Sequence, residues 1–246
     1  DGPYHGPTWY VSTDGSDETG DGSIDLPYQT IQWAVSACSI QDTVILLPGS
    51  YEIESPIEFP EFPIIIRSSE GFPNTSIIGS QYPVLLSNTA PSICLSTIQG
   101  ITFEEFSYIG QGLQYLPHFE ECKFSNIEYT GGIFNMAPSD SIAQFDHCIF
   151  AQNTAHNSPI DGLFTGTSFY VNFTNCSFAW NANGIFRIDY GGVTFNNCIV
   201  RTGLGAINQT SKQANYSFIE YPDEFNISSM YECIDGQVQG SPGFVD

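Results

Sequence analysis

Short runs of alternating hydrophobic and polar residues fill the chain, and one such run occurs four times in the same form. Each copy reads apolar, two polar residues, cysteine, any residue, apolar, and the copies occupy residues 119–124, 145–150, 173–178 and 195–200. Side chains on a strand alternate between its two faces, so the cysteine and the last apolar residue share one face. The first phenylalanine is out of phase with them. A bend between it and the cysteine restores the phase and directs all three side chains inward.

A second motif, glycine followed by two apolar residues, comes after each copy, at residues 132–134, 162–164, 184–186 and 205–207. Each unit therefore predicts a strand, a corner, a second strand, a polar turn and a third strand. The four cysteines are 26, 28 and 22 residues apart. Because the inward pattern stays constant while the length varies, the additional residues belong to loops. This repeat predicts an all-β solenoid, a parallel β-helix in which each coil pairs with the next. An antiparallel β-sandwich also has short strands, but it does not repeat a motif in register.

The repeats also predict a core ladder in which equivalent residues stack from coil to coil. Its expected members are Cys122, Cys148, Cys176, Cys198, Phe103, Phe124, Phe150 and Phe178. Burial of each phenylalanine ring contributes about 2–3 kcal/mol of stabilisation. Stacked Cα atoms about 4.8 Å apart lie within the distance range of a disulfide, but parallel side chains strain that bond. We therefore expect a ladder of buried thiols, with disulfides between neighbouring coils as the alternative.

The N-terminal part of the chain differs from the repeats. Ile31, Ala34, Val35 and Cys38 have the spacing of one helix face, which predicts an amphipathic helix over residues 28–38. We expect this helix to cover the N-terminal end of the solenoid, where the first coil would otherwise expose unpaired backbone groups. Residues 42–51 are expected to form a buried strand that ends in a Pro-Gly turn, and further strands are expected near 57–59, 63–66, 76–78 and 84–86.

The whole chain, residues 1–246, is expected to form one domain. Residues 1–51 supply an N-terminal arm, the cap and the first coil, residues 52–218 the further coils, and residues 219–246 a C-terminal loop and last segment. No second capping helix is evident in the C-terminal sequence. That end is therefore expected to be partly open, so that it pairs with another chain through backbone hydrogen bonds.

Several motifs in the N-terminal segment occur in a characteristic order. They are Tyr10-Val-Ser, Gly15-Ser-Asp, Pro27-Tyr-Gln-Thr-Ile-Gln-Trp-Ala, Asp42-Thr-Val and Pro48-Gly-Ser-Tyr. This order resembles the cap and first coil of pectin lyase-like proteins, and the later Asn-Cys and Gly-Ile-Thr-Phe motifs and residues 240–246 are similar too. The resemblance spans nearly the whole chain and implies a right-handed, single-stranded parallel β-helix. It implies little about function, because the fold hosts lyases, hydrolases, adhesins and passive stalks.

The net charge of the chain disfavours some classes of binding partner. The chain has 27 acidic residues against 5 basic ones, a net charge of −22. This balance disfavours nucleic acid, since phosphate binding needs clustered Lys and Arg, and it repels polyanionic sugars. No apolar run is long enough to span a membrane. The first residues resemble a processed mature end or an excised fragment. Six Asn-x-Ser/Thr sequons predict a secreted, extracellular glycoprotein. The sequons are at Asn74, Asn172, Asn175, Asn208, Asn215 and Asn226.

Candidate catalytic residues are few. Arg187 and Asp189 follow one glycine motif and Asp161 lies one or two coils away, but a weak surface ion pair is the simpler interpretation. An acidic loop contains the candidate Ca²⁺ ligands Asp17, Thr19, Asp21 and Asp25. The bidentate glutamate that normally completes such a loop is absent, so we expect plain cap structure and no cofactor.

Together these features favour a secreted, glycosylated solenoid with a structural or adhesive role rather than a catalytic one. Such a protein would be a head-to-tail building block of an extracellular coat, stalk or filament, associating through its ends or contacting glycans and other matrix components. The alternatives are a carbohydrate-active enzyme, either a polysaccharide lyase or a glycoside hydrolase, and a glycan-binding module.

Overall fold

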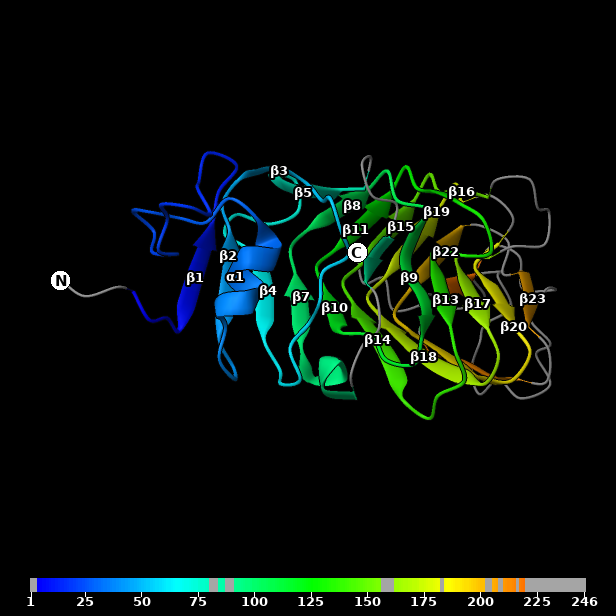
Figure 1. Cartoon of the computed structure of the whole chain (residues 1–246). Coiled ribbons are helices and arrows are strands. Elements are labelled where there is room, and N and C mark those ends of the chain that lie inside the picture. The colour runs from blue at the N-terminus through cyan, green and yellow to red at the C-terminus, as the bar shows by residue number, and fades with distance from the viewer. Residues whose placement is uncertain are drawn as a thin grey trace.

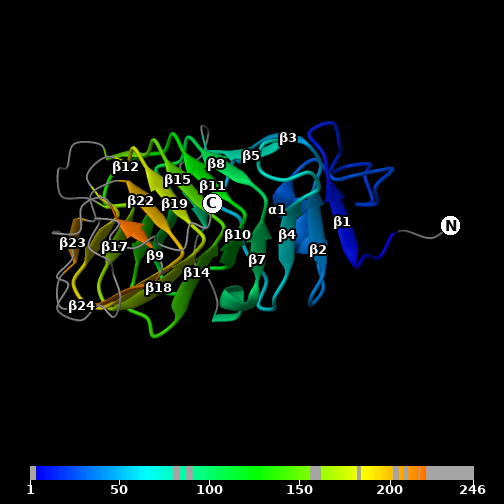
Figure 2. The ribbon, with the colours of Figure 1, turned by 180° about the vertical axis from the view of Figure 1, so that it is seen from behind.

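The computed structural model describes residues 4–79, 84–86, 91–155, 162–181, 184–201, 205–207, 210–215 and 217–219. Within these ranges the chain winds into a parallel β-helix whose coils stack along one axis (Figure 1 and Figure 2). Strands of successive coils pair in parallel throughout the three long sheets. The predicted fold class is confirmed.

Three sheets run along the solenoid. Sheet 1 has nine strands, in spatial order β1 Thr8–Val11, β2 Thr43–Leu46, β4 Ile65–Ser68, β7 Thr97–Gln99, β10 His118–Glu120, β14 Ile142–Asp146, β18 Phe169–Thr174, β21 Gly191–Asn196 and β24 Thr210–Asn215. Sheet 2 has eight, β3 Gly49–Glu52, β5 Thr75–Ile78, β8 Thr102–Glu104, β11 Lys123–Ser125, β15 Ile149–Ala151, β19 Ser177–Ala179, β22 Ile199–Arg201 and β25 Phe218–Ile219. Sheet 3 has six, β6 Val84–Leu86, β9 Tyr108–Leu113, β13 Phe134–Met136, β17 Phe164–Gly166, β20 Phe186–Ile188 and β23 Gly205–Ile207.

Two short elements lie outside these sheets. β12 Glu128–Tyr129 pairs with β16 Thr154–Ala155 where the chain leaves sheet 2, and a 3₁₀ turn covers Pro91–Leu95.

Stacked phenylalanines form the interior, with one column behind each sheet. Behind sheet 1, Phe119, Phe145, Phe173 and Phe195 stack with ring centroids 5.2, 5.3 and 5.3 Å apart. Behind sheet 2, Phe103, Phe124, Phe150 and Phe178 stack at 5.1, 4.9 and 4.7 Å. Behind sheet 3, Phe134 and Phe164 stack at 4.8 Å. Rings of different columns meet edge to face, for example Phe119 on Phe124, so each ring has both favourable aromatic geometries.

The corner from sheet 1 to sheet 2 is the bend that the repeat required. The residue before each cysteine has a left-handed backbone: φ is 51° at Glu121, 56° at His147, 55° at Asn175 and 52° at Asn197. A second such corner follows sheet 2, at Glu105, Asn126, Gln152 and Trp180, where φ lies between 54° and 60°. A left-handed backbone costs a non-glycine residue roughly 1–2 kcal/mol. The packing of the phenylalanines on both sides of each corner offsets that cost.

The cysteines form a buried column beside the first corner. Cys122, Cys148, Cys176 and Cys198 are all free thiols with at most 1% of their surface exposed. Each sulfur lies near a carbonyl oxygen of the preceding coil, as Cys148 Sγ does at 3.4 Å from Phe119 O. Burial raises the pKa of the Cys148 thiol, which keeps it protonated and able to donate this hydrogen bond. The register continues the column to Ser217, whose hydroxyl accepts a hydrogen bond from Cys198 N–H.

The predicted capping helix is α1, Ile31–Ala37, which buries Ile31, Ala34 and Val35. It lies in front of β2 and β4 in Figure 1 and behind them in the reverse view of Figure 2, and it contacts β1 and β2. The helix begins three residues later than predicted, because Tyr28 instead pairs with Val11 of β1.

The free edge of β1 is covered by the acidic loop rather than by the helix. Tyr10 N–H donates to Gly22 O, Tyr28 N–H donates to Tyr10 O, and Ser12 N–H donates to Tyr28 O, each at 2.8–2.9 Å. Trp9 stacks on Tyr28 and donates its indole N–H to Asp42 Oδ2 at 2.9 Å. The loop thus satisfies backbone groups that an open first coil would expose.

The strand and the Pro-Gly turn expected within residues 42–51 are present as β2 and the turn after it, and a further strand that the pattern does not predict follows them. β2 ends at Leu46, and the chain turns and continues as β3 from Gly49. Pro48 lies in this turn, since a proline cannot donate a hydrogen bond within a central strand. The strand expected at residues 57–59 is reduced to one bridge between Ile57 and Leu86.

We predict that Phe150→Ala lowers the free energy of unfolding by about 3–5 kcal/mol, because it removes the ring between Phe124 and Phe178 and leaves a cavity. Chemical denaturation followed by circular dichroism measures the loss. Gln144→Ala, an exposed change on β14, is the matched control with an expected effect below about 0.5 kcal/mol. A loss below about 1 kcal/mol for Phe150→Ala would show that the column is not a main source of stability.

Candidate functional site

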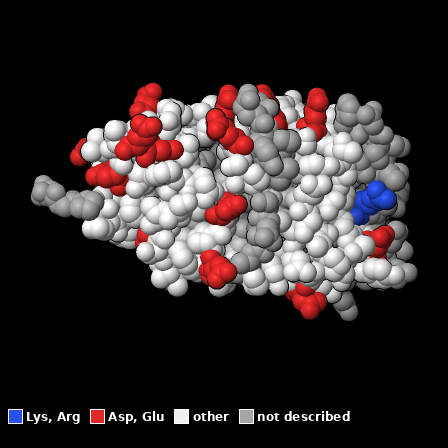
Figure 3. Space-filling model, in the orientation of Figure 1, with Lys and Arg blue, Asp and Glu red and all other residues white. Residues whose placement is uncertain are grey.

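On the face drawn in Figure 3, acidic side chains are widely spread and basic ones are few. In Figure 3 red atoms occur along the whole molecule, and blue atoms appear only near the end formed by the later coils. The outward side of sheet 1 combines this acidity with uncharged hydrogen-bonding groups, and it brings the largest set of polar side chains into register.

Two rows of outward side chains cross the middle strands of sheet 1, and we call them together the sheet-1 face. The strand register aligns Gln99, Glu120, Asp146, Thr174 and Asn196 in the first row. The second row contains Thr97, His118, Gln144, Asn172 and Thr194. They point outward because the residues between the rows, such as Phe119 and Phe145, fill the interior. Arg67 of β4 extends the first row as the partner of Gln99.

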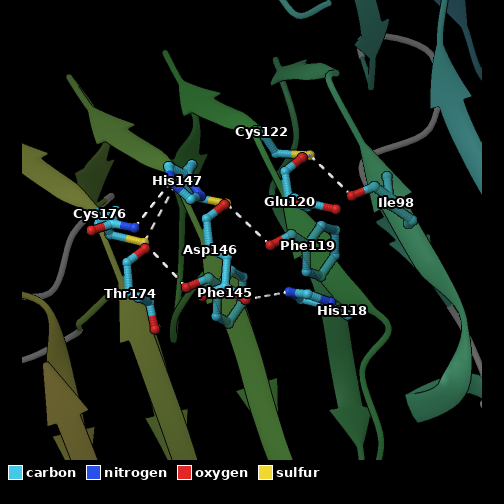
Figure 4. Close-up of polar contacts among 12 residues, drawn as sticks. Ile98, His118, Phe119, Glu120, Cys122, Phe145, Asp146, His147, Thr174 and Cys176 are labelled. Carbon is cyan, nitrogen blue, oxygen red and sulfur yellow. Dashed lines mark hydrogen bonds and ion pairs between the residues drawn. The ribbon is translucent and has the colours of Figure 1, made fainter. Parts of the chain in front are cut away.

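An ion pair lies at the centre of this face. His118 Nε2 and Asp146 Oδ2 are 2.6 Å apart, across β10 and β14, with side-chain exposures of 28% and 30% (Figure 4). Glu120 is the direct cross-strand partner of Asp146, so two carboxylates and one imidazole share one small area. Such a group is able to accept hydrogen bonds from hydroxyls, and a histidine held by a carboxylate is also able to move a proton.

The first corner adds a polar border to the face. Asn175 Nδ2 and His147 Nε2 are 3.0 Å apart, and Asn197 Nδ2 donates to Asn175 Oδ1 at 2.6 Å. Gln99 Nε2 donates to Glu121 Oε2 at 3.4 Å. These contacts link side chains of successive coils, so the border is fixed by hydrogen bonds as well as by the backbone. His147 is a corner residue, in the bend that the repeat predicts between Phe145 and Cys148.

One aromatic side chain stands on the same face. Tyr170 of β18 is 41% exposed and pairs with Ile142, which is 48% exposed. The face therefore offers an apolar platform beside amides, hydroxyls and carboxylates.

The candidate catalytic residues do not share this face. Arg187 lies in β20 of sheet 3 and Asp189 follows the same strand, and both are exposed. Asp161 lies outside the described residues. The structure thus places Arg187 and Asp189 on one side of sheet 3, away from His118 and Asp146.

The candidate calcium ligands have structural partners in the cap. Asp17 Oδ1 accepts hydrogen bonds from the backbone N–H groups of Gln29 and Thr30, at 2.8 and 3.0 Å, and Asp17 Oδ2 accepts from Thr30 Oγ1 at 2.7 Å. Asp21 accepts from Ser23 N–H at 2.9 Å, and the hydrogen bonds from Ser23 lower the pKa of this carboxyl. Thr19 and Asp25 are exposed.

The described residues contain neither a candidate metal site nor a candidate membrane helix. No group of three His, Cys, Asp or Glu side chains there is placed to hold a metal ion. No helix in the described part of the chain is long and apolar enough to cross a membrane.

Three of the six sequons have described side chains. Asn74 is exposed in the turn before β5, Asn172 lies in the second row of the sheet-1 face, and Asn175 lies in its border. Asn215 ends β24, its side chain outside the described part, and Asn208 and Asn226 lie outside the described residues.

The sequence interpretation missed the pairing of His118 with Asp146. The positions of the two residues in the repeat could have revealed this pairing. His118 immediately precedes the repeated Phe119, and Asp146 immediately follows Phe145, the equivalent residue of the next copy. Residues on either side of an inward phenylalanine point outward, and neighbouring copies of the repeat are neighbouring strands.

No protein-family model matches the chain, and no curated protein matches it in sequence. It is similar to two solved structures. A rhamnogalacturonan lyase has 13% sequence identity and a TM-score of 0.49, with 86% of this chain and 68% of the lyase covered. Pectate lyase Pel9A has the same identity and TM-score, with 85% and 62% covered. The parallel β-helix seen in the strand pairing agrees with the resemblance to the pectin lyase-like superfamily, and that resemblance is one of fold.

We predict that Asp17→Ala lowers the free energy of unfolding by about 1–2 kcal/mol, because three hydrogen bonds between the acidic loop and the start of α1 are lost. Thermal denaturation with and without Ca²⁺ or a chelator measures the effect. Asp25→Ala is the matched control and should change little. A calcium-dependent stabilisation that both substitutions abolish would instead identify the loop as a metal site.

Proposed function

We propose that this protein is a secreted, glycosylated β-solenoid with an adhesive role, and that its sheet-1 face contacts a neutral polysaccharide. The observation that supports this proposal is the register of sheet 1. It repeats hydrogen-bonding side chains from coil to coil, about 4.8 Å apart, along the direction in which an extended polymer would lie.

The chemistry of the face suits a ligand with many hydroxyl groups. Gln144, Asn172 and Asn196 each offer a donor and an acceptor, and Thr174 and Thr194 offer hydroxyls. Glu120 and Asp146 accept hydrogen bonds from hydroxyls but repel acidic sugars. A neutral polymer therefore fits this surface better than a polyuronate or a nucleic acid.

The solenoid supplies rigidity to this contact. The side chains of both rows come from strands of sheet 1, and the residues next to them on these strands point inward and stack as rings. Phe145, for example, lies between Phe119 and Phe173. A surface that is ordered before binding loses less conformational entropy when the ligand arrives. Many individually weak hydrogen bonds then sum to useful affinity along a repeating polymer.

The proposal includes a structural role, in which copies of the protein associate through the ends of the solenoid. The outer edge of β1 already pairs with the acidic loop, so a new strand does not add there without displacing that loop. Head-to-tail assembly would therefore use the surface of the acidic loop at one end and the last described coils at the other. Residues 220–246 lie outside the described part of the chain.

The second candidate is a carbohydrate-active enzyme, and the grouping of His118, Asp146 and Glu120 favours it. Paired carboxylates beside a histidine provide an acid and a base for cleavage of a glycosidic bond. In that case Asp146 would position the His118 ring, and Glu120 would face the substrate.

We predict that the protein sediments with at least one insoluble neutral polysaccharide from a panel of cellulose, xylan, mannan, chitin and starch. Replacement of Gln99, Asp146, Thr174 and Asn196 by alanine should weaken this binding at least about tenfold, since several hydrogen bonds of about 0.5–1.5 kcal/mol each are lost. Arg187→Ala, on sheet 3, is the control and should bind as the unmodified protein does.

Equal binding of the sheet-1 variant, or no binding of the native protein to any polymer, would refute adhesion through this face. The same incubations are assayed for released oligosaccharides. Turnover that Asp146→Asn abolishes would establish the enzyme instead, and turnover that only Arg187→Ala abolishes would locate catalysis on sheet 3.

We predict N-glycosylation at Asn74 and not at Asn175 when the chain passes through a eukaryotic secretory pathway. Asn74 is exposed in a turn, whereas the amide of Asn175 is held between His147 and Asn197. Mass spectrometry of glycopeptides after enzymatic deglycosylation measures occupancy at each site. An occupied Asn175 with an empty Asn74 would contradict this assignment.

A further inference from the structure

Trp180 is the most exposed large hydrophobic side chain among the described residues. Its relative exposure is 78%, and its backbone is left-handed with φ of 55°. A left-handed backbone is unfavourable for a bulky residue, and exposure of an indole gives no packing in return. The strained backbone at Trp180 is not offset by packing of its side chain, which indicates that the exposed indole has a role on the surface.

The backbone around Trp180 is fixed on both sides. Phe178 stacks on Phe150 at 4.7 Å with a 3° interplanar angle. Asn181 is buried, and its Nδ2 donates to Phe150 O at 2.8 Å while its Oδ1 accepts from Asn153 Nδ2 at 2.9 Å. The indole is therefore presented on a rigid corner rather than on a loose loop.

Planar amides occupy the same corner position on the two preceding coils. The register of Phe124, Phe150 and Phe178 aligns Asn126, Gln152 and Trp180, and all three of these corner residues are exposed. Coils are about 4.8 Å apart, so Gln152 and Trp180 are at neighbouring backbone positions along the corner. Glu128 and Thr154 of the neighbouring strands β12 and β16 are also exposed and polar.

We propose that Trp180, with Gln152 and Asn126, forms a binding site for a pyranose ring of a neutral glycan. The apolar face of the sugar ring stacks on the indole, and the two amides exchange hydrogen bonds with ring hydroxyls. This site lies after sheet 2, at a corner that does not adjoin the sheet-1 face, and it is independent of the adhesive contact proposed above.

A glycan fits this corner better than a protein partner does. Protein interfaces centre on contiguous apolar patches, whereas the described neighbours of Trp180 along the corner are amides, a carboxylate and a hydroxyl. The net charge of −22 also disfavours an acidic sugar here.

The test uses the full chain and soluble hexasaccharides of β-1,4-linked glucose, mannose and xylose, with hexagalacturonate as the acidic comparison. Binding is followed by isothermal titration calorimetry and by tryptophan fluorescence. Trp180→Asn places at this corner the residue that Asn126 supplies two coils earlier, so the fold is retained. Trp180→Phe keeps a smaller ring, and Trp33→Gln, on α1, removes another half-exposed indole.

We expect at least one neutral hexasaccharide to bind with a dissociation constant of about 1 mM or below and to shift the tryptophan emission. Trp180→Asn should weaken binding at least about tenfold and abolish the emission shift, Trp180→Phe should be intermediate, and Trp33→Gln should bind normally. The alanine variant of sheet 1 should keep the tryptophan emission shift at the same hexasaccharide concentrations, which separates this site from the first.

Unchanged binding by Trp180→Asn, equal loss with Trp33→Gln, or no response to any neutral hexasaccharide at about 10 mM would overturn the proposal. Self-association that depends on Trp180, measured by sedimentation velocity without any sugar, would assign the indole to a protein interface and would overturn it as well.

Discussion

The stacking of phenylalanine rings between successive coils is the interaction on which the other features depend. Each interior ring of the central coils lies between two others of its own column, as Phe150 does between Phe124 and Phe178. Rings of neighbouring columns meet it edge to face. This arrangement needs every coil to be in register with the one before it, because a slip of one residue would turn the rings outward. The register of the inward-facing rings therefore also determines which outward-facing side chains are neighbours on the surface.

Keeping this register has an energetic cost in the backbone conformation of the corners. Non-glycine residues such as Glu121 and Gln152 adopt a left-handed backbone so that the rings on both sides of each corner point inward. Short polar residues tolerate this conformation best, which accounts for Asn126, Asn175 and Asn197. At the first corner, the amide of Asn197 donates a hydrogen bond to the amide oxygen of Asn175 on the preceding coil. Trp180 departs from that rule, and the departure is what marks its corner as a functional surface.

Both proposed contact surfaces are consequences of a rigid, repeating interior. On sheet 1, polar residues lie in rows because the phenylalanines between them lie in a column. At the second corner, an indole and two amides align because the strands before them pair in register. Such surfaces suit a polymer whose units also repeat, and the excess of acidic residues disfavours an anionic polymer.

The sequence by itself determined the architecture, because a solenoid repeats its inward positions at readable intervals. The cysteine and phenylalanine positions, the bend between them and the helix near Ile31 all follow from local periodicity. Tertiary structure alone decided which outward residues meet, since contacts such as His118 with Asp146 join residues 28 positions apart. Loop lengths between coils vary, so the sequence does not specify which side chains face each other across strands. The same holds for the cap: a folded loop, not the helix, pairs with β1, because those bonds form between backbone groups that carry no side-chain signature.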